Sequence, residues 1–178
     1  LPLNPEVISL EVESILAHMR AFLLLEDWLR QKHRIDVSRK VTPFINAFPR
    51  AYAMKVLSFN YKPDMNKLID DYIRHNPTRN RDLDMLCLFK FIDRQRVKKK
   101  LKDTLINPRP TFHYRLPDCR LDDESWNISQ ELALWEEVEK LAQDETRLHD
   151  LMWAFRKQVE QVIPKQKWAE YMTEQLGY

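Results

Sequence analysis

Glycine is almost absent from this chain, since Gly177 is the only glycine among its 178 residues. Average usage would give about a dozen. P-loops, dinucleotide fingerprints and glycine-rich flaps all depend on glycine, because only glycine lets the backbone approach a phosphate group closely. The sequence therefore excludes these three kinds of nucleotide site within the chain.

The composition is otherwise that of an ordinary globular domain, with 44% hydrophobic and 31% charged residues. The 29 basic and 27 acidic residues leave a net charge of only +2, so no overall field calls for nucleic acid or a membrane surface. The longest apolar stretches, residues 21–25 and 151–155, are far shorter than the roughly 18 residues that span a bilayer. We therefore expect a cytoplasmic protein with no nucleic-acid or membrane partner, and the sequence leaves a homo-oligomer open.

Most of the chain has helical periodicity. Apolar side chains recur at three- and four-residue spacing over residues 5–32, which predicts a long core helix. Asp64 and Asp93 are suitable N-cap residues for two later helices. Prolines end several segments, because proline cannot continue a helix. The predicted helices after the first cover residues 49–59, 64–75, 82–91, 94–103, 127–141, 144–163 and 165–176.

One of these helices carries a run of basic residues. Val97 and Leu101 are spaced to anchor it on one side, so the run is typical of a solvated helix face. A surface that follows a nucleic-acid backbone would need interleaved aromatic residues, which are missing here. The basic residues are Arg94, Arg96, Lys98, Lys99 and Lys100.

Residues 111–116, between two prolines, alternate polar and apolar side chains, which predicts a strand. Thr111, His113 and Arg115 would then share one face, and the apolar residues Phe112, Tyr114 and Leu116 the other. A hydroxyl, an imidazole and a guanidinium in line suit a phosphate or metal-phosphate group. An edge strand with a solvated outer face has the same alternation, so both interpretations stay open.

Four stretches carry a family resemblance: AFLLLEDWLR at 21–30, TPFINAFPRAY at 42–52, LIDDYIRHNPTRNRDLDML at 68–86 and RPTFHYRLPDC at 109–119. With them the chain resembles the bacterial putative amidoligase family, which is similar to the carboxylate-amine ligases of the glutamine synthetase and glutamate-cysteine ligase fold. The resemblance implies an α+β, predominantly α-helical chain that forms the C-terminal part of a glutamine synthetase-like antiparallel-sheet fold with few strands. Residues 1–126 would be the C-terminal part of the catalytic domain, and residues 127–178 a set of C-terminal helices.

The resemblance also implies a reaction. ATP would phosphorylate a carboxylate, and an amine would displace phosphate from the acyl phosphate to form an amide. The implied cofactors are ATP and Mg²⁺ or Mn²⁺, and the implied substrates are a small-molecule or peptide carboxylate and an amine. His113 would bind the metal, Arg115 and Arg81 would act in catalysis, and Arg79, Asn80 and Arg115 would bind the nucleotide.

The chain begins at Leu1 rather than Met, so we expect it to be a piece of a longer enzyme. The family's earlier strands, with their acidic and histidine metal ligands, have no counterpart before Leu1. We therefore expect an incomplete metal site and no activity from this chain alone. The alternatives are a non-catalytic helical interaction module, a degenerate remnant, or a hydrolase, for which no serine or cysteine nucleophile lies near His113 in sequence. A helical module should not place His113 and Arg115 side by side over a concave pocket.

Overall fold

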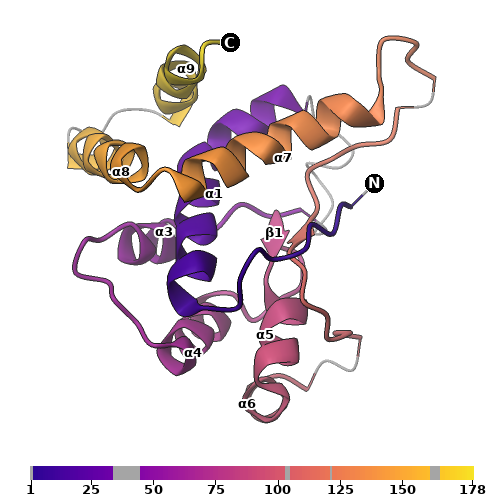
Figure 1. Ribbon diagram of the computed structural model, residues 1–178, viewed down its shortest axis with the longest axis vertical. Helices are drawn as coiled ribbons and strands as arrows, with labels where there is room; N and C mark the ends of the chain where they lie inside the picture. The colour runs from indigo at the N-terminus through magenta and orange to yellow at the C-terminus, as the bar shows by residue number, and fades with distance from the viewer. Residues whose placement is uncertain (1, 34–44, 103–104, 121, 161–164) are drawn as a thin grey trace.

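The computed structural model describes residues 2–33, 45–102, 105–120, 122–160 and 165–178 (Figure 1). Within these ranges the protein is predominantly helical, with a small two-stranded antiparallel sheet, which confirms the coarse fold class. The helices are α1 (Val12–Lys32), α3 (Arg50–Val56), α4 (Met65–His75), α5 (Leu86–Ile92), α6 (Arg94–Lys100), α7 (Ile128–Gln143), α8 (Glu145–Glu160) and α9 (Lys165–Leu176), and the strands are β1 (Leu83–Asp84) and β2 (His113–Tyr114).

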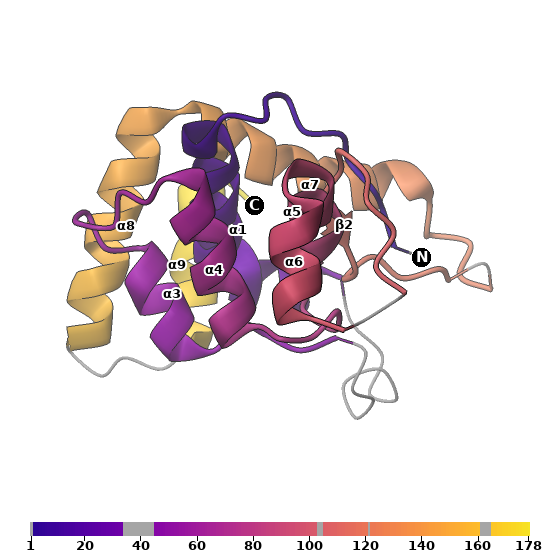
Figure 2. The same cartoon turned by 90° about the horizontal axis from the view of Figure 1, so that it is seen from below.

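Helix α1 is the centre of the core. It packs against α3 and α4 as well as α7, α8 and α9, as Figures 1 and 2 show. Because it has neighbours on several sides, apolar residues are buried around much of its circumference, Phe22, Leu25 and Trp28 among them. The indole Nε1 of Trp168 in α9 donates to the Leu24 carbonyl at 2.7 Å, which fixes α9 on α1.

The predicted start of the first helix was wrong, because α1 begins at Val12 rather than at residue 5. The preceding residues instead run antiparallel to residues 110–114, with Leu3 and Tyr114 exchanging two backbone hydrogen bonds of 2.9 Å. Pro5 has no N–H to donate, but its carbonyl accepts from the Phe112 N–H at 2.9 Å. Extended pairing therefore satisfies backbone groups that a helix would have used.

The strand predicted over residues 111–116 is present but shorter, since β2 covers only His113–Tyr114. Its regular ladder is the pair β1–β2, in which Leu83 lies opposite Tyr114 and Asp84 opposite His113. An isolated bridge between Glu6 and Thr111 extends the pairing on the N-terminal side. The alternation is confirmed, since the side chains of one parity are buried and those of the other are partly exposed. The buried set is Phe112, Tyr114 and Leu116, and the partly exposed set is Thr111, His113 and Arg115.

The pairing of β1 also corrects the predicted helix 82–91, of which only α5 is helical. Leu83 and Asp84 hydrogen-bond to β2 instead, and the Arg115 N–H donates to the Asp82 carbonyl at 2.8 Å. Two predicted caps are confirmed: Asp64 accepts from the N–H of Lys67 at 2.7 Å, and Asp93 caps α6.

The other helices lie close to their predicted positions. The helix after Pro49 ends at Val56 rather than at residue 59, and α7 runs two residues further than predicted. The predicted end of α8 at residue 163 lies outside the described residues. The division at residue 126 and the glutamine synthetase-like relationship stay predictions. Among the described residues, no helix has both the length and the apolar character to span a membrane.

Candidate functional site

His113 lies at the meeting point of two chain segments that antiparallel pairing brings together. Its Nδ1 is 2.8 Å from Oδ1 of Asn4, in the N-terminal segment, and 3.0 Å from Nη2 of Arg109. Arg109 also donates from Nη2 to Asn4 at 2.7 Å and from Nε to Oγ1 of Thr111 at 3.1 Å. The partly exposed face of the strand therefore carries an interlocked group of polar side chains.

Asp84 lies opposite His113 in the ladder of β1 and β2. Its Oδ2 is 3.3 Å from Nη2 of Arg115, and its Oδ1 accepts from the Leu86 N–H at 3.0 Å. The side chain is only 5% exposed. Burial raises the pKa of Asp84 above its ordinary value, against the opposing effects of the Leu86 N–H, Arg115 and Arg79.

The surroundings of His113 are cationic. Burial, and then the charges of Arg115, Arg109 and Arg79, lower the pKa of His113 to about 4. The imidazole is therefore neutral at pH 7, and the charges of three guanidiniums act on it. We call His113 with Arg79, Arg109 and Arg115 the arginine cluster. Guanidiniums bind phosphate through charged, often paired hydrogen bonds, so this group fits a phosphate-bearing ligand.

The same groups do not fit a resident divalent metal. The described residues contain no cluster of three or more His, Cys, Asp or Glu side chains that could hold a metal ion. The guanidinium charges that oppose protonation of His113 also oppose a divalent cation beside it. The metal-binding role of His113 stays a prediction of the resemblance.

Arg79 belongs to the cluster, whereas Arg81 and Asn80 contact a different segment. Arg81 donates from Nη1 to the Ala47 carbonyl at 2.7 Å, just before α3. The Asn46 N–H donates to the carbonyl of Asn80 at 2.8 Å. These contacts hold residues 45–47 against the end of the loop. The predicted catalytic role of Arg81 and the nucleotide-binding role of Asn80 stay predictions.

Sequence reasoning missed Arg109, Asp84 and Asn4. A signal for Arg109 was present, because it precedes Thr111 by two residues and therefore has the parity of the exposed face. Asp84 could be placed only through the register that sets it opposite His113. Asn4 gave no signal, since its position depends on a pairing across more than a hundred residues.

Cys87 lies beside the cluster and is a buried residue. Its thiol is buried and donates to the Thr111 carbonyl at 3.3 Å. Burial and the charge of Asp84 raise the pKa of this thiol to about 11, so it stays protonated at pH 7. It therefore offers no thiolate nucleophile for the hydrolase alternative.

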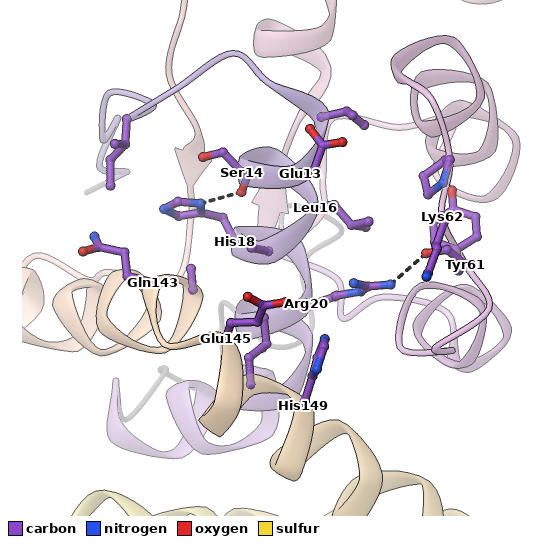
Figure 3. A pocket seen from close by; sticks show the side chains of 16 residues that line it. Glu13, Ser14, Leu16, His18, Arg20, Tyr61, Lys62, Gln143, Glu145 and His149 are labelled. Atoms are coloured by element: carbon purple, nitrogen blue, oxygen red, sulfur yellow. Dashed lines mark hydrogen bonds between the residues drawn. The ribbon is translucent and has the colours of Figure 1, made fainter.

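A cavity of about 750 Å³ lies away from the arginine cluster, among α1, residues 61–63 and the junction of α7 and α8 (Figure 3). His18 lines it and stacks on Phe112, which is on the buried face of the strand, at 5.2 Å between ring centroids. Arg20 also lines it, but its guanidinium donates to the carbonyls of Val56, Ser58 and Tyr61 at 2.8 to 3.3 Å.

The charges around this cavity have both signs, since Glu13, Glu145, Arg20 and Lys62 all line it (Figure 3). Because Arg20 already donates to the backbone after α3, the described residues that line the cavity offer no converging set of anion-binding groups. Neither His113 nor Arg115 lines it. The arginine cluster is therefore the better candidate for phosphate chemistry, although it lies on a partly exposed face rather than in this cavity.

The comparisons with known proteins agree with the resemblance. Residues 1–136 match the model of the family described as "Putative amidoligase enzyme". This match covers well over half of the chain and includes all four residues of the arginine cluster. No curated protein and no solved structure matches the chain. On the family match, the chain belongs to the amidoligase family.

Proposed function

We propose that this chain supplies the phosphate-binding part of an ATP-dependent ligase that joins a carboxylate to an amine through an acyl phosphate. The observation that carries the proposal is the arginine cluster, in which Arg109 lies 3.0 Å from the imidazole of His113 and the charges of Arg115 and Arg79 also act on it. Family membership supports amide formation as the reaction. The arginine cluster and the family membership together favour an amide-forming reaction in which ATP first phosphorylates the carboxylate.

The proposed reaction has two steps. A carboxylate oxygen of the substrate attacks the γ-phosphorus of ATP, the bond to the β,γ-bridging oxygen breaks, and ADP leaves. The amine then attacks the acyl carbon, and the carbon–oxygen bond to phosphate breaks. Negative charge is spread over the phosphoryl oxygens in both steps, and Arg109 and Arg115 would stabilise it through charged hydrogen bonds.

His113 would accept the proton that the amine loses. If its Nδ1–H donates to Asn4, the Nε2 lone pair remains available for that proton. With a pKa of about 4 the free site is a weak base at pH 7. A bound phosphate would offset the guanidinium charges and raise the pKa of His113, so that the base becomes effective when the substrate is in place.

The non-catalytic alternative is less well supported. His113 and Arg115 share one face of the strand, beside Arg79 and Arg109, which an interaction module has no evident need to arrange. The face is partly exposed, and the 750 Å³ cavity is lined by other residues. The decision between ligase and module therefore rests on whether the cluster binds a nucleotide.

Calorimetric titration of the chain with ATP tests the proposal. Arg109→Gln should weaken ATP binding about tenfold or more, because one charged, paired hydrogen-bond donor is lost. Arg50→Gln is the matched control. Arg50 is exposed at the start of α3, and its substitution removes one positive charge, as Arg109→Gln does. Equal affinities for the two variants, or no ATP binding by the unaltered chain, would refute the proposed role of the cluster.

A further inference from the structure

A second group of cations lines a cavity of about 470 Å³ between α5, α6 and residues 106–108. Figure 1 shows α5 and α6 following one another at the lower end of the molecule. Among the described lining residues there is neither a carboxylate nor an aromatic ring. Four of the lining residues are cations, which we call the row: Lys90 in α5, Arg94 and Lys98 in α6, and Lys102 beyond the end of α6.

The two sides of α6 differ in how their charges are compensated. On one side, Arg96 forms ion pairs with Asp70 at 3.0 Å and with Asp93 at 3.1 Å, and Lys100 lies 3.4 Å from Asp70. Within the described part of the chain, no ion pair joins Arg94, Lys98 or Lys102 of the row to a carboxylate. The row therefore keeps its positive charge, whereas carboxylates neutralise much of the charge on the other side of α6.

The row and the arginine cluster meet at one segment. Lys90 donates from Nζ to the Ile106 carbonyl at 2.6 Å, and Arg79 donates from Nη1 to the preceding carbonyl, of Leu105, at 3.3 Å. Pro108 lines the cavity and His113 lies five residues later, so their Cα atoms are at most about 18 Å apart even along a fully extended chain. A short peptide can therefore contact both.

We propose that this cavity binds the acidic side chains of a peptide whose reacting carboxylate lies at the arginine cluster. The inference rests on the proposed function and names its substrate class. The uncompensated cations of the row suit several carboxylates spaced along a chain better than one isolated anion. Leu101 and Ile106 can contact the methylene groups of glutamate, whereas nucleic-acid bases would find no ring on which to stack.

Binding of fluorescein-labelled hexaglutamate, followed by fluorescence anisotropy at low and at physiological salt, tests this inference. The double variant Lys98→Gln/Lys102→Gln should bind the peptide about tenfold more weakly than the unaltered chain, since two attractive charges are lost. The matched control is Lys99→Gln/Lys100→Gln, which removes two charges outside the cavity lining and should change affinity by less than about threefold.

Equal losses in the two double variants would overturn the inference, because they would indicate a general effect of net charge. So would equal binding of labelled hexaglutamine, or tighter binding of a labelled oligothymidine of matched length. ATP titration of the same samples separates the two proposals. Peptide binding without ATP binding refutes the proposed function alone, and ATP binding without selective peptide binding refutes this inference alone.

Discussion

Arg115→Gln is expected to lower the rate of ATP-dependent amide formation by at least about 100-fold in the enzyme that contains this chain. In the proposed mechanism the Arg115 guanidinium stabilises charge on the transferring phosphoryl group, and glutamine keeps a polar side chain but no charge. Hydroxylamine trapping measures the effect, because hydroxylamine converts an acyl phosphate into a hydroxamate while ADP is released. The rates of hydroxamate formation and of ADP release should fall together.

The same substitution should affect folding modestly. Asp84 is buried and would lose the Arg115 donor while it keeps the Leu86 N–H, at a cost of about 1–2 kcal/mol in the free energy of unfolding. Arg115→Lys keeps the charge beside Asp84 but loses the planar fork, so it should restore stability more fully than turnover. Unchanged turnover in Arg115→Gln would remove this residue from the mechanism.

His33→Ala is expected to lower the free energy of unfolding by about 3–5 kcal/mol. Nδ1 of His33 is 2.5 Å from the carboxylate of Glu131 in α7, and its Nε2 accepts from the Tyr114 hydroxyl of β2. Trp126 donates to the other carboxylate oxygen at 2.8 Å. Removing the imidazole would take one partner from the buried Tyr114 hydroxyl and one from the buried Glu131 carboxylate, to which Trp126 would still donate. Urea unfolding followed by circular dichroism measures the loss.

His149→Ala is the matched control, because His149 lies exposed on α8 and contacts Phe59 through its ring. It should change the free energy of unfolding by no more than about 0.5 kcal/mol. Glu131→Gln replaces the carboxylate by an amide that can still contact His33 and Trp126. Its loss in the free energy of unfolding should lie between those of His33→Ala and His149→Ala. Similar small losses for His33→Ala and His149→Ala would contradict the view that this buried network holds α7 against β2.

The features that sequence predicted well depend on local signals. The alternation over residues 111–116 indicated which side chains would be buried, and Asp64 and Asp93 marked helix starts through bonds within one turn. The predicted helix at Pro5 failed for the opposite reason. Its backbone groups pair with residues 110–114, and apolar periodicity near the N-terminus contains no information about that partner.

The candidate site was predictable in part. His113 and Arg115 follow from strand parity, but the position of Arg79 beside them depends on how the loop before β1 folds. Arg81 is two residues after Arg79, yet it donates to the Ala47 carbonyl. The local sequence around Arg81 contains no information that residue 47 lies next to it. The reaction class came from the family resemblance, because guanidiniums and a histidine alone indicate an anion rather than a reaction.

The most direct measurement of the central claim is the pKa of His113, followed by NMR of its ring with and without inorganic phosphate. Without phosphate, burial and the guanidiniums should hold this pKa at about 4. Saturating phosphate should raise it by about one unit or more, because the added negative charge favours the imidazolium form. A His113 pKa that is the same with and without phosphate would contradict the assignment of the arginine cluster as a phosphate site.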